Sequence, residues 1–171
     1  MSLVNRILPA NANNDYRGSP IAFYGLCLFA AMFTFRSLVH YFKEDGGANS
    51  IATIITFPGS PDPDQVLYLA FSLWGSQQII TLCILLLVLV RYRTLIPFML
   101  LMLVLEQVLR IGAGAMHPLT PEYFESRPPG VRANVPLLGI ALLLLALSLR
   151  DLGRVTVGRA SGQASPGVDE G

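Results

Sequence analysis

Charged residues are scarce in this chain. Only 13% of its 171 residues are Asp, Glu, Lys or Arg, whereas 53% are hydrophobic, and the mean hydropathy is +0.54. A soluble domain carries about twice that share of charge, so the composition excludes an ordinary water-soluble protein and indicates a membrane protein. The net charge is +1 and there is no basic run, so nothing in the sequence indicates nucleic-acid binding.

Cysteine is also rare. Cys27 and Cys83 each stand alone, without the C-x-x-C spacing that thiol–disulfide exchange with a quinone uses. The sequence therefore excludes that activity, which is well known among small four-helix membrane proteins. Both cysteines are expected to be small side chains of the core.

Long apolar runs, by contrast, occur four times. A helix needs about 20 mostly apolar residues to cross a hydrocarbon core of roughly 30 Å, and within lipid only a helix satisfies its own backbone groups. The sequence thus predicts an all-α, four-helix transmembrane bundle with up-down topology, in one domain over residues 19–152. The expected spans are residues 21–42, 66–90, 95–115 and 131–149.

Capping and turn residues separate these spans. Ser19 and Pro20 place a capping side chain and a first-turn proline at the start of the first span. Asp64 is expected to cap the second helix. The link over residues 90–97 is so short that the second and third helices are expected to form a tight antiparallel hairpin.

The distribution of basic residues predicts the orientation. One side of the membrane would hold Arg6, Arg17, Arg91, Arg93, Arg150, Arg154 and Arg159, and the other side Lys43, Arg127 and Arg132. Cytoplasmic loops are the richer ones, so both termini are expected to be cytoplasmic. Residues 1–18 lack the apolar core of a cleavable signal peptide and form a short cytoplasmic segment, while residues 153–171 are expected to be a disordered cytoplasmic tail.

Polar residues within the spans are the main functional signal. Counted at 1.5 Å per residue from the outer helix ends, Arg36, Trp74 and Glu106 lie at a similar depth of roughly 10–12 Å. A charge in hydrocarbon costs about 2.5–3.5 kcal/mol on insertion scales, so such residues turn inward and pair. The expected outer-leaflet cluster consists of Arg36, His40, Trp74, Gln77, Gln78, Glu106 and Arg110.

Glu106 is the only carboxylate available to two arginines at this depth. We expect it to pair with Arg36 across helices and with Arg110 one turn along its own helix. Gln77 or Gln78 is expected to satisfy the remaining polar groups. One positive charge is left over, so the cluster is a structural clamp, a pocket for an amphiphile, or part of a proton or ion path.

Two further features allow alternatives. His40 and His117 both come at outer helix ends, so together they allow ligation of a b-type haem or a metal ion, although no spacing motif supports this and no cofactor is predicted. The apolar stretch 49–59 in the first link is too short to span. It is expected to lie at the membrane interface or to dip toward the bundle as a lid.

Several motifs lie on the second and third helices: SLWGSQQ (72–78), RYRTLIPFM (91–99), E-x-x-x-R (Glu106 and Arg110) and GAGAMHP (112–118). Together they resemble a group of uncharacterised bacterial four-helix membrane proteins that are loosely similar to the DoxX-like class. The resemblance implies a multi-pass protein of the bacterial inner (cytoplasmic) membrane. Quinone-linked redox roles of DoxX-like proteins enter only as an analogy.

The function expected from these features is non-catalytic, and no catalytic residue is predicted. The protein is expected to be a membrane component whose outer-leaflet pocket binds an amphiphile, such as a lipid or quinone headgroup, or a partner membrane protein, with a homo-oligomer as one form of partner. A quinone- or haem-linked oxidoreductase subunit and an oligomeric small-solute transporter are the alternatives.

Overall fold

The computed structural model describes residues 2–126 and 128–150, and in these residues it is all-helical. The predicted disordered tail, 153–171, lies outside the described residues. The elements are α1 (Leu3–Ile7), α2 (Pro20–Phe42), α3 (Asp64–Arg91), η1 (Arg93–Leu95), α4 (Ile96–Met116), η2 (Pro121–Tyr123) and α5 (Pro129–Ser148). Ser19 caps α2 as expected, because its side chain accepts a hydrogen bond from the N–H of Ile21 at 3.2 Å.

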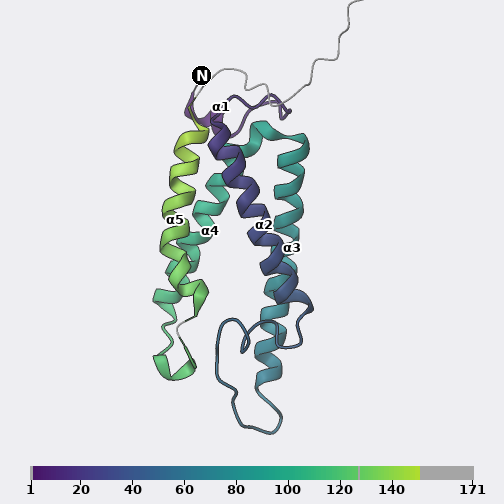
Figure 1. The fold of residues 1–171 in the computed structure, drawn as a ribbon, viewed down its shortest axis with the longest axis vertical. Helices are drawn as coiled ribbons and strands as arrows, with labels where there is room; N and C mark the ends of the chain where they lie inside the picture. Colours follow the sequence, from purple (N-terminus) through teal and green to yellow (C-terminus); the bar gives the residue numbers. More distant parts are fainter. Residues whose placement is uncertain (1, 127, 151–171) are drawn as a thin grey trace, which may run out of the picture.

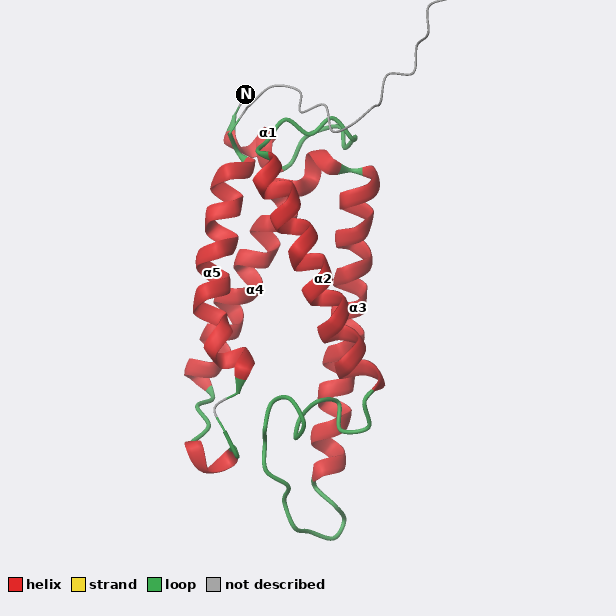
Figure 2. Ribbon diagram, viewed as in Figure 1, coloured by secondary structure: helices red, strands yellow, loops and turns green. Residues whose placement is uncertain are grey.

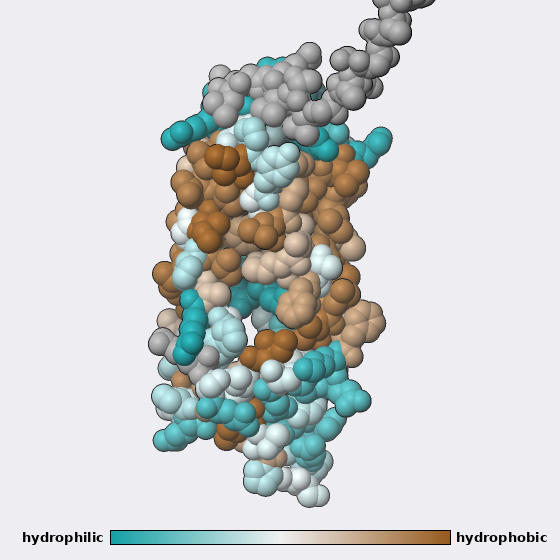
Figure 3. Space-filling view, in the orientation of Figure 1, coloured by the Kyte–Doolittle hydropathy of each residue, from teal (hydrophilic) through white to brown (hydrophobic). Residues whose placement is uncertain are grey.

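Four of these helices are long and apolar enough to cross a membrane, with mean hydropathies of 1.6 to 2.1. Only 11% to 33% of each span is buried inside the protein, so large apolar side chains cover the outside of the bundle (Figure 3). An apolar surface of this extent indicates contact with lipid. The prediction of four helices that are long and apolar enough to cross a membrane is confirmed, and their predicted ends agree with the structure within two residues.

The long helices form two pairs. Successive long helices run in opposite directions, so the N-terminus and residue 150 lie at the same end (Figure 1). α2 packs mainly against α3, and α4 packs mainly against α5. The two pairs meet at the end that carries α1 and diverge toward the other end (Figure 2).

The apolar core fills the half of the bundle in which the pairs meet. Its fully buried large side chains are Leu26, Phe33, Leu85, Ile96, Leu100 and Leu103. Further along the inward faces the buried residues become polar, with Ser37 on α2, Gln78 on α3 and Gln107 on α4. The sequence thus places its polar side chains in the half of the bundle where the pairs diverge.

The link from α3 to α4 is short, as expected, because Tyr92 ends α3 and η1 leads directly into α4. The tight hairpin predicted for these two helices is nevertheless wrong. α3 and α4 contact each other little and belong to different pairs (Figure 1). α3 packs along α2 instead, because its small residue Gly75 allows a close approach to that helix.

The prediction that Asp64 caps the second helix is also wrong. Pro63 is the N-cap of α3, and Asp64 is the first residue of the helix. The carboxylate of Asp64 accepts a hydrogen bond from the backbone N–H of Phe57 at 3.2 Å. Asp64 therefore holds the preceding link against the start of the helix.

The two cysteines differ in environment. Cys27 is half-buried and packs against the core, whereas Cys83 lies exposed on α3. The expectation that both belong to the core is therefore wrong for Cys83. α3 carries more apolar surface than its neighbours cover, so the thiol of Cys83 faces outward.

Gly75 provides a test of the α2–α3 contact. A Cβ at this position would lie 2.7 Å from both the backbone carbonyl carbon of His40 and the backbone nitrogen of Tyr41. We predict that Gly75→Ala lowers the free energy of unfolding by about 1–3 kcal/mol, because backbone atoms must shift to admit the methyl group. Thermal unfolding of the purified protein in detergent measures the effect.

Gly112→Ala is the matched control, because a Cβ at Gly112 on α4 meets nothing within 4 Å. Its stability should stay the same or rise, since alanine favours a helix by about 1 kcal/mol over glycine. An equal loss of stability in both variants would contradict the proposed close contact.

Candidate functional site

Arg36 is the centre of the predicted cluster. Its Nε donates a hydrogen bond to Oε1 of Gln78 on α3 at 2.5 Å, and its Nη2 donates to Oε1 of Glu106 on α4 at 2.9 Å. Both contacts are charge-assisted and are therefore stronger than neutral hydrogen bonds. One side chain of α2 thus connects the two helix pairs beyond the end of the apolar core.

Arg110 approaches the same carboxylate oxygen. Its Nη1 lies 3.6 Å from Oε1 of Glu106, one turn away along α4. This distance is an ion-pair contact and is too long for a good hydrogen bond. Nη1 is buried and has no hydrogen-bond partner among the described residues. Two guanidinium groups therefore share one carboxylate, and these three side chains carry a net charge of +1.

Trp74 of α3 lies beside both arginines. Its ring centroid is 5.4 Å from Cζ of Arg36 and 5.1 Å from Cζ of Arg110, and the ring of His40 is 4.6 Å away. Cation–π contacts of this kind stabilise by about 0.5–2 kcal/mol. Trp74 is 36% exposed and is the only tryptophan in the chain, so an external molecule can reach it.

The turn after α2 positions His40. The Nδ1 atom of this buried ring lies 2.7 Å from the carbonyl oxygen of Gly46. Gly46 and Gly47 have φ values of 56° and 79°, a left-handed conformation that suits glycine. Burial tends to raise the pKa of Asp45, but hydrogen bonds from Ser50 and Gly47 outweigh it and keep that pKa below its ordinary value. The ionised carboxylate of Asp45 therefore helps to hold this turn.

The first link crosses from one helix pair to the other at the end nearest the site. Ile54 forms an isolated antiparallel bridge with Phe124, which lies in the link before α5. The N–H of Glu125 donates a hydrogen bond to the carbonyl of Thr53 at 2.8 Å. The apolar stretch 49–59 therefore lies across the end of the bundle as a strap between the two pairs.

The space-filling view shows a hollow on the side of the bundle, with hydrophilic residues at its floor and both apolar and hydrophilic residues at its rim (Figure 3). The side chains of Arg36, Glu106 and Arg110 are 17%, 27% and 22% exposed. These charged groups are thus shielded by the helices while remaining open to contact. The arrangement can bind a polar group that arrives from the side of the bundle.

Two buried glutamines carry amide atoms without partners. Nε2 of Gln78, and both Nε2 and Oε1 of Gln107, have no hydrogen-bond partner among the described residues. Gln107 is 0% exposed. An unpaired buried amide costs about 1–3 kcal/mol. The sequence-based cluster did not include Gln107, although its spacing from Leu103 and Arg110 places it on the inward face of α4.

Two predicted residues lie apart from the cluster. Gln77 is exposed, and its side chain makes no hydrogen bond within the described part of the chain, so Gln78 alone supplies the amide. His117 is the exposed C-cap of α4, whereas His40 is buried under the glycine turn. The structure therefore brings Arg36, His40, Trp74, Gln78, Glu106 and Arg110 together.

Across residues 2–126 and 128–150, no group of three or more His, Cys, Asp or Glu side chains could hold a metal ion.

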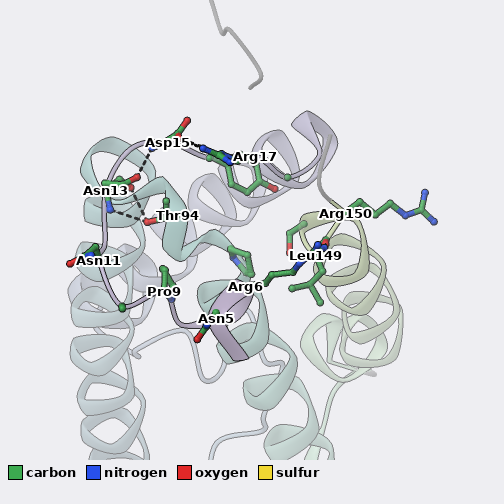
Figure 4. Close-up of a pocket in the computed structure, with 15 residues that line it drawn as sticks. Asn5, Arg6, Pro9, Asn11, Asn13, Asp15, Arg17, Thr94, Leu149 and Arg150 are labelled. Atoms are coloured by element: carbon green, nitrogen blue, oxygen red, sulfur yellow. Dashed lines mark hydrogen bonds and ion pairs between the residues drawn. The ribbon is translucent and has the colours of Figure 1, made fainter. Parts of the chain in front are cut away.

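Another cavity, of about 440 Å³, lies at the opposite end of the bundle between the N-terminal segment, the start of α4 and the end of α5 (Figure 4). Arg6 donates a hydrogen bond to the carbonyl of Leu149 at 2.6 Å, and Arg17 pairs with Asp15 at 3.1 Å. Residues 2–18 thus fold over the bundle and contain α1, a helix that the sequence did not predict. Arg6 joins this segment to the end of α5, whereas Arg17 pairs with Asp15 within the segment.

No protein-family model, curated protein or solved structure matches the chain. The resemblance to DoxX-like proteins rests on the sequence motifs alone and stays a prediction. The functional argument therefore depends on the geometry of the site.

Neutralising Glu106 tests the role of the shared carboxylate. We predict that Glu106→Gln lowers the free energy of unfolding by about 2–3 kcal/mol, because two guanidinium groups lose their counter-ion. A fully buried pair would lose about 3–5 kcal/mol, but this carboxylate side chain is 27% exposed. Thermal unfolding of the purified protein measures the loss.

The double variant Arg36→Gln/Glu106→Gln shows whether the loss comes from the ion pair. It removes both charges of the 2.9 Å contact, so its destabilisation should be smaller than the sum of the two single losses by about 0.5–3 kcal/mol. Strictly additive losses would mean that the two side chains do not interact.

Proposed function

We propose that this protein is a small, non-catalytic, multi-pass membrane protein that binds an amphiphile at a lateral polar site between its two helix pairs. One observation carries the proposal: two arginines share one carboxylate beside an exposed indole, in a surface that is otherwise apolar. Unbalanced charge in hydrocarbon is costly. An amphiphile supplies a polar headgroup to this charge and apolar chains to the surrounding surface.

A structural clamp alone does not require the second arginine. Arg36 already joins α2 to α4 through Glu106 and joins α2 to α3 through Gln78. Arg110 adds a positive charge that neither link uses, and its Nη1 lacks a hydrogen-bond partner among the described residues. A buried donor that the fold leaves unused supports a ligand.

We also propose that both termini face the cytoplasm of a bacterial cell, so that the site opens in the outer leaflet of the inner membrane. The end of the bundle that carries α1 holds Arg6, Arg17, Arg91, Arg93 and Arg150. The opposite end holds fewer basic residues, with Lys43 and Arg132 in its described part. An excess of Lys and Arg is typical of the cytoplasmic side.

Reporter fusions test this orientation. Green fluorescent protein joined after Gly171 is expected to fluoresce, and alkaline phosphatase at the same position is expected to be inactive, because each enzyme or fluorophore matures on only one side of the membrane. Alkaline phosphatase inserted after Ser60, in the first link, should be active. The reverse pattern would place the site in the inner leaflet.

The amphiphile itself can be recovered with the protein. We predict that protein extracted with its surrounding lipid in polymer nanodiscs carries one amphiphile class, a lipid or a quinone, enriched severalfold over the bulk membrane by mass spectrometry. The variant Arg110→Gln/Trp74→Leu should lose this enrichment, because it removes the unused charge and the exposed ring.

Lys43→Gln is the control for general loss of positive charge. Lys43 is exposed at the C-cap of α2, at the same end of the bundle, and takes no part in the cluster. It should retain the enriched amphiphile. A wild-type extract with the same composition as the bulk membrane would count against the proposed function.

A further inference from the structure

The inference that follows rests on the proposed function and concerns the chemistry of the headgroup. We infer that the amphiphile is anionic and that its phosphate-type oxygens are held by the guanidinium of Arg110 and the free amide N–H of Gln78. A neutral quinone offers acceptor oxygens without charge, and a zwitterionic lipid brings a cationic group together with its phosphate, so neither cancels the surplus positive charge of this site.

The balance of charge is the first reason. In the part of the chain that the structure describes, Glu106 is the only carboxylate within 4.0 Å of either Arg36 or Arg110. Arg36, Arg110 and Glu106 together therefore carry a net charge of +1. A neutral headgroup leaves that charge without a counter-ion in an apolar setting, whereas a singly charged oxyanion cancels it.

The unused hydrogen-bonding groups are the second reason. Nε of Arg36 can only donate, so the amide of Gln78 must present Oε1 to it and leave Nε2 free. Nη1 of Arg110, which lies 3.6 Å from the carboxylate of Glu106, also has no hydrogen-bond partner among the described residues. Both groups are donors that lack an acceptor, and the oxygens of a phosphate are charged acceptors.

The surroundings of Arg110 are the third reason. The guanidinium of Arg110 lies next to Gly130, in the first turn of α5. A Cβ built at Gly130 would have Nη2 of Arg110 as its nearest neighbour, at 3.6 Å. α5 has 20 residues and no side-chain cap at its N-terminus, so its first turn adds uncapped N–H groups and a partial positive charge next to the guanidinium. Arg110, Gln78 and this helix start therefore favour the same sign of ligand.

The surface around the site suits the chains of a lipid. Leu105, Val108 and Leu109 of α4 are exposed large apolar residues that flank the charged pair along the helix. Arg110 lies six residues, about 9 Å, before the end of α4, close enough to the membrane surface for a lipid phosphate to reach it. The ligand can therefore place its headgroup at the charged groups while its chains stay in the bilayer.

Trp74 provides a direct test, because it is the only tryptophan and its ring lies 5.1 Å from Cζ of Arg110. The full-length protein is reconstituted in phosphatidylcholine vesicles that contain an equal, low mole fraction of either dibrominated phosphatidylglycerol or dibrominated phosphatidylcholine. Bromine quenches tryptophan at short range. We expect half-maximal quenching at a severalfold lower mole fraction of the anionic lipid.

Variants identify the groups responsible. Arg110→Gln should bring the two quenching curves together, and it should fold, because Arg36 and Glu106 still form a neutral pair. Arg110→Lys should keep most of the preference. Lys43→Gln, which lowers the positive charge at the same end of the bundle, should leave the two curves apart.

The possible results separate this inference from the proposed function. Two results would overturn the anionic headgroup but keep an amphiphile site. One is equal, saturable quenching by both lipids. The other is saturable quenching by a ubiquinone analogue that Arg110→Gln does not alter. Quenching that rises only in proportion to mole fraction for every ligand overturns the proposed function as well. Relief of quenching by inorganic phosphate shows that the site takes the free ion and overturns the lipid assignment.

Discussion

The contacts of Arg36 hold the two helix pairs together in the half of the bundle where the apolar core is absent. In lipid, apolar helix surfaces gain little by burial against each other, so polar contacts and close packing decide how helices associate. The core ends near Phe33 and Leu103, and beyond it the 2.9 Å contact of Arg36 with Glu106 connects α2 to α4. Trp74, which is 36% exposed, lies beside this connection.

The site carries surplus charge because Arg110 shares the carboxylate that already pairs with Arg36. Arg36 donates a hydrogen bond to Oε1 of Glu106, and Arg110 lies 3.6 Å from the same oxygen. One carboxylate cannot neutralise two guanidinium groups, and the fold adds the indole of Trp74 instead of a second carboxylate. An aromatic face stabilises a cation without cancelling its charge. The charge therefore stays available to a molecule from outside the protein.

The sequence predicts those features that the membrane itself dictates. The ends of the four spans follow from the number of apolar residues needed to cross the hydrocarbon, and the meeting of Arg36 with Glu106 follows from their depth. The pairing of the helices does not follow from depth, because it depends on the absence of a side chain at Gly75. The strap depends on backbone pairing between Ile54 and Phe124, which are far apart in the sequence and carry no periodic signal.

The strap also joins the two helix pairs, at the end of the bundle beyond the charged groups. The apolar core joins the two pairs on one side of the site, and the strap joins them on the other, where Glu125 bonds Thr53 and the hydroxyl of Thr53 bonds the carbonyl of Ser126. Thr53 has a φ of 55°, an unusual value for a residue with a branched side chain. The charged groups thus lie between the core and the strap, and their side chains stay 17% to 27% exposed. Under the proposed function, such a site selects its ligand by the headgroup, because any amphiphile of the bilayer can supply the chains.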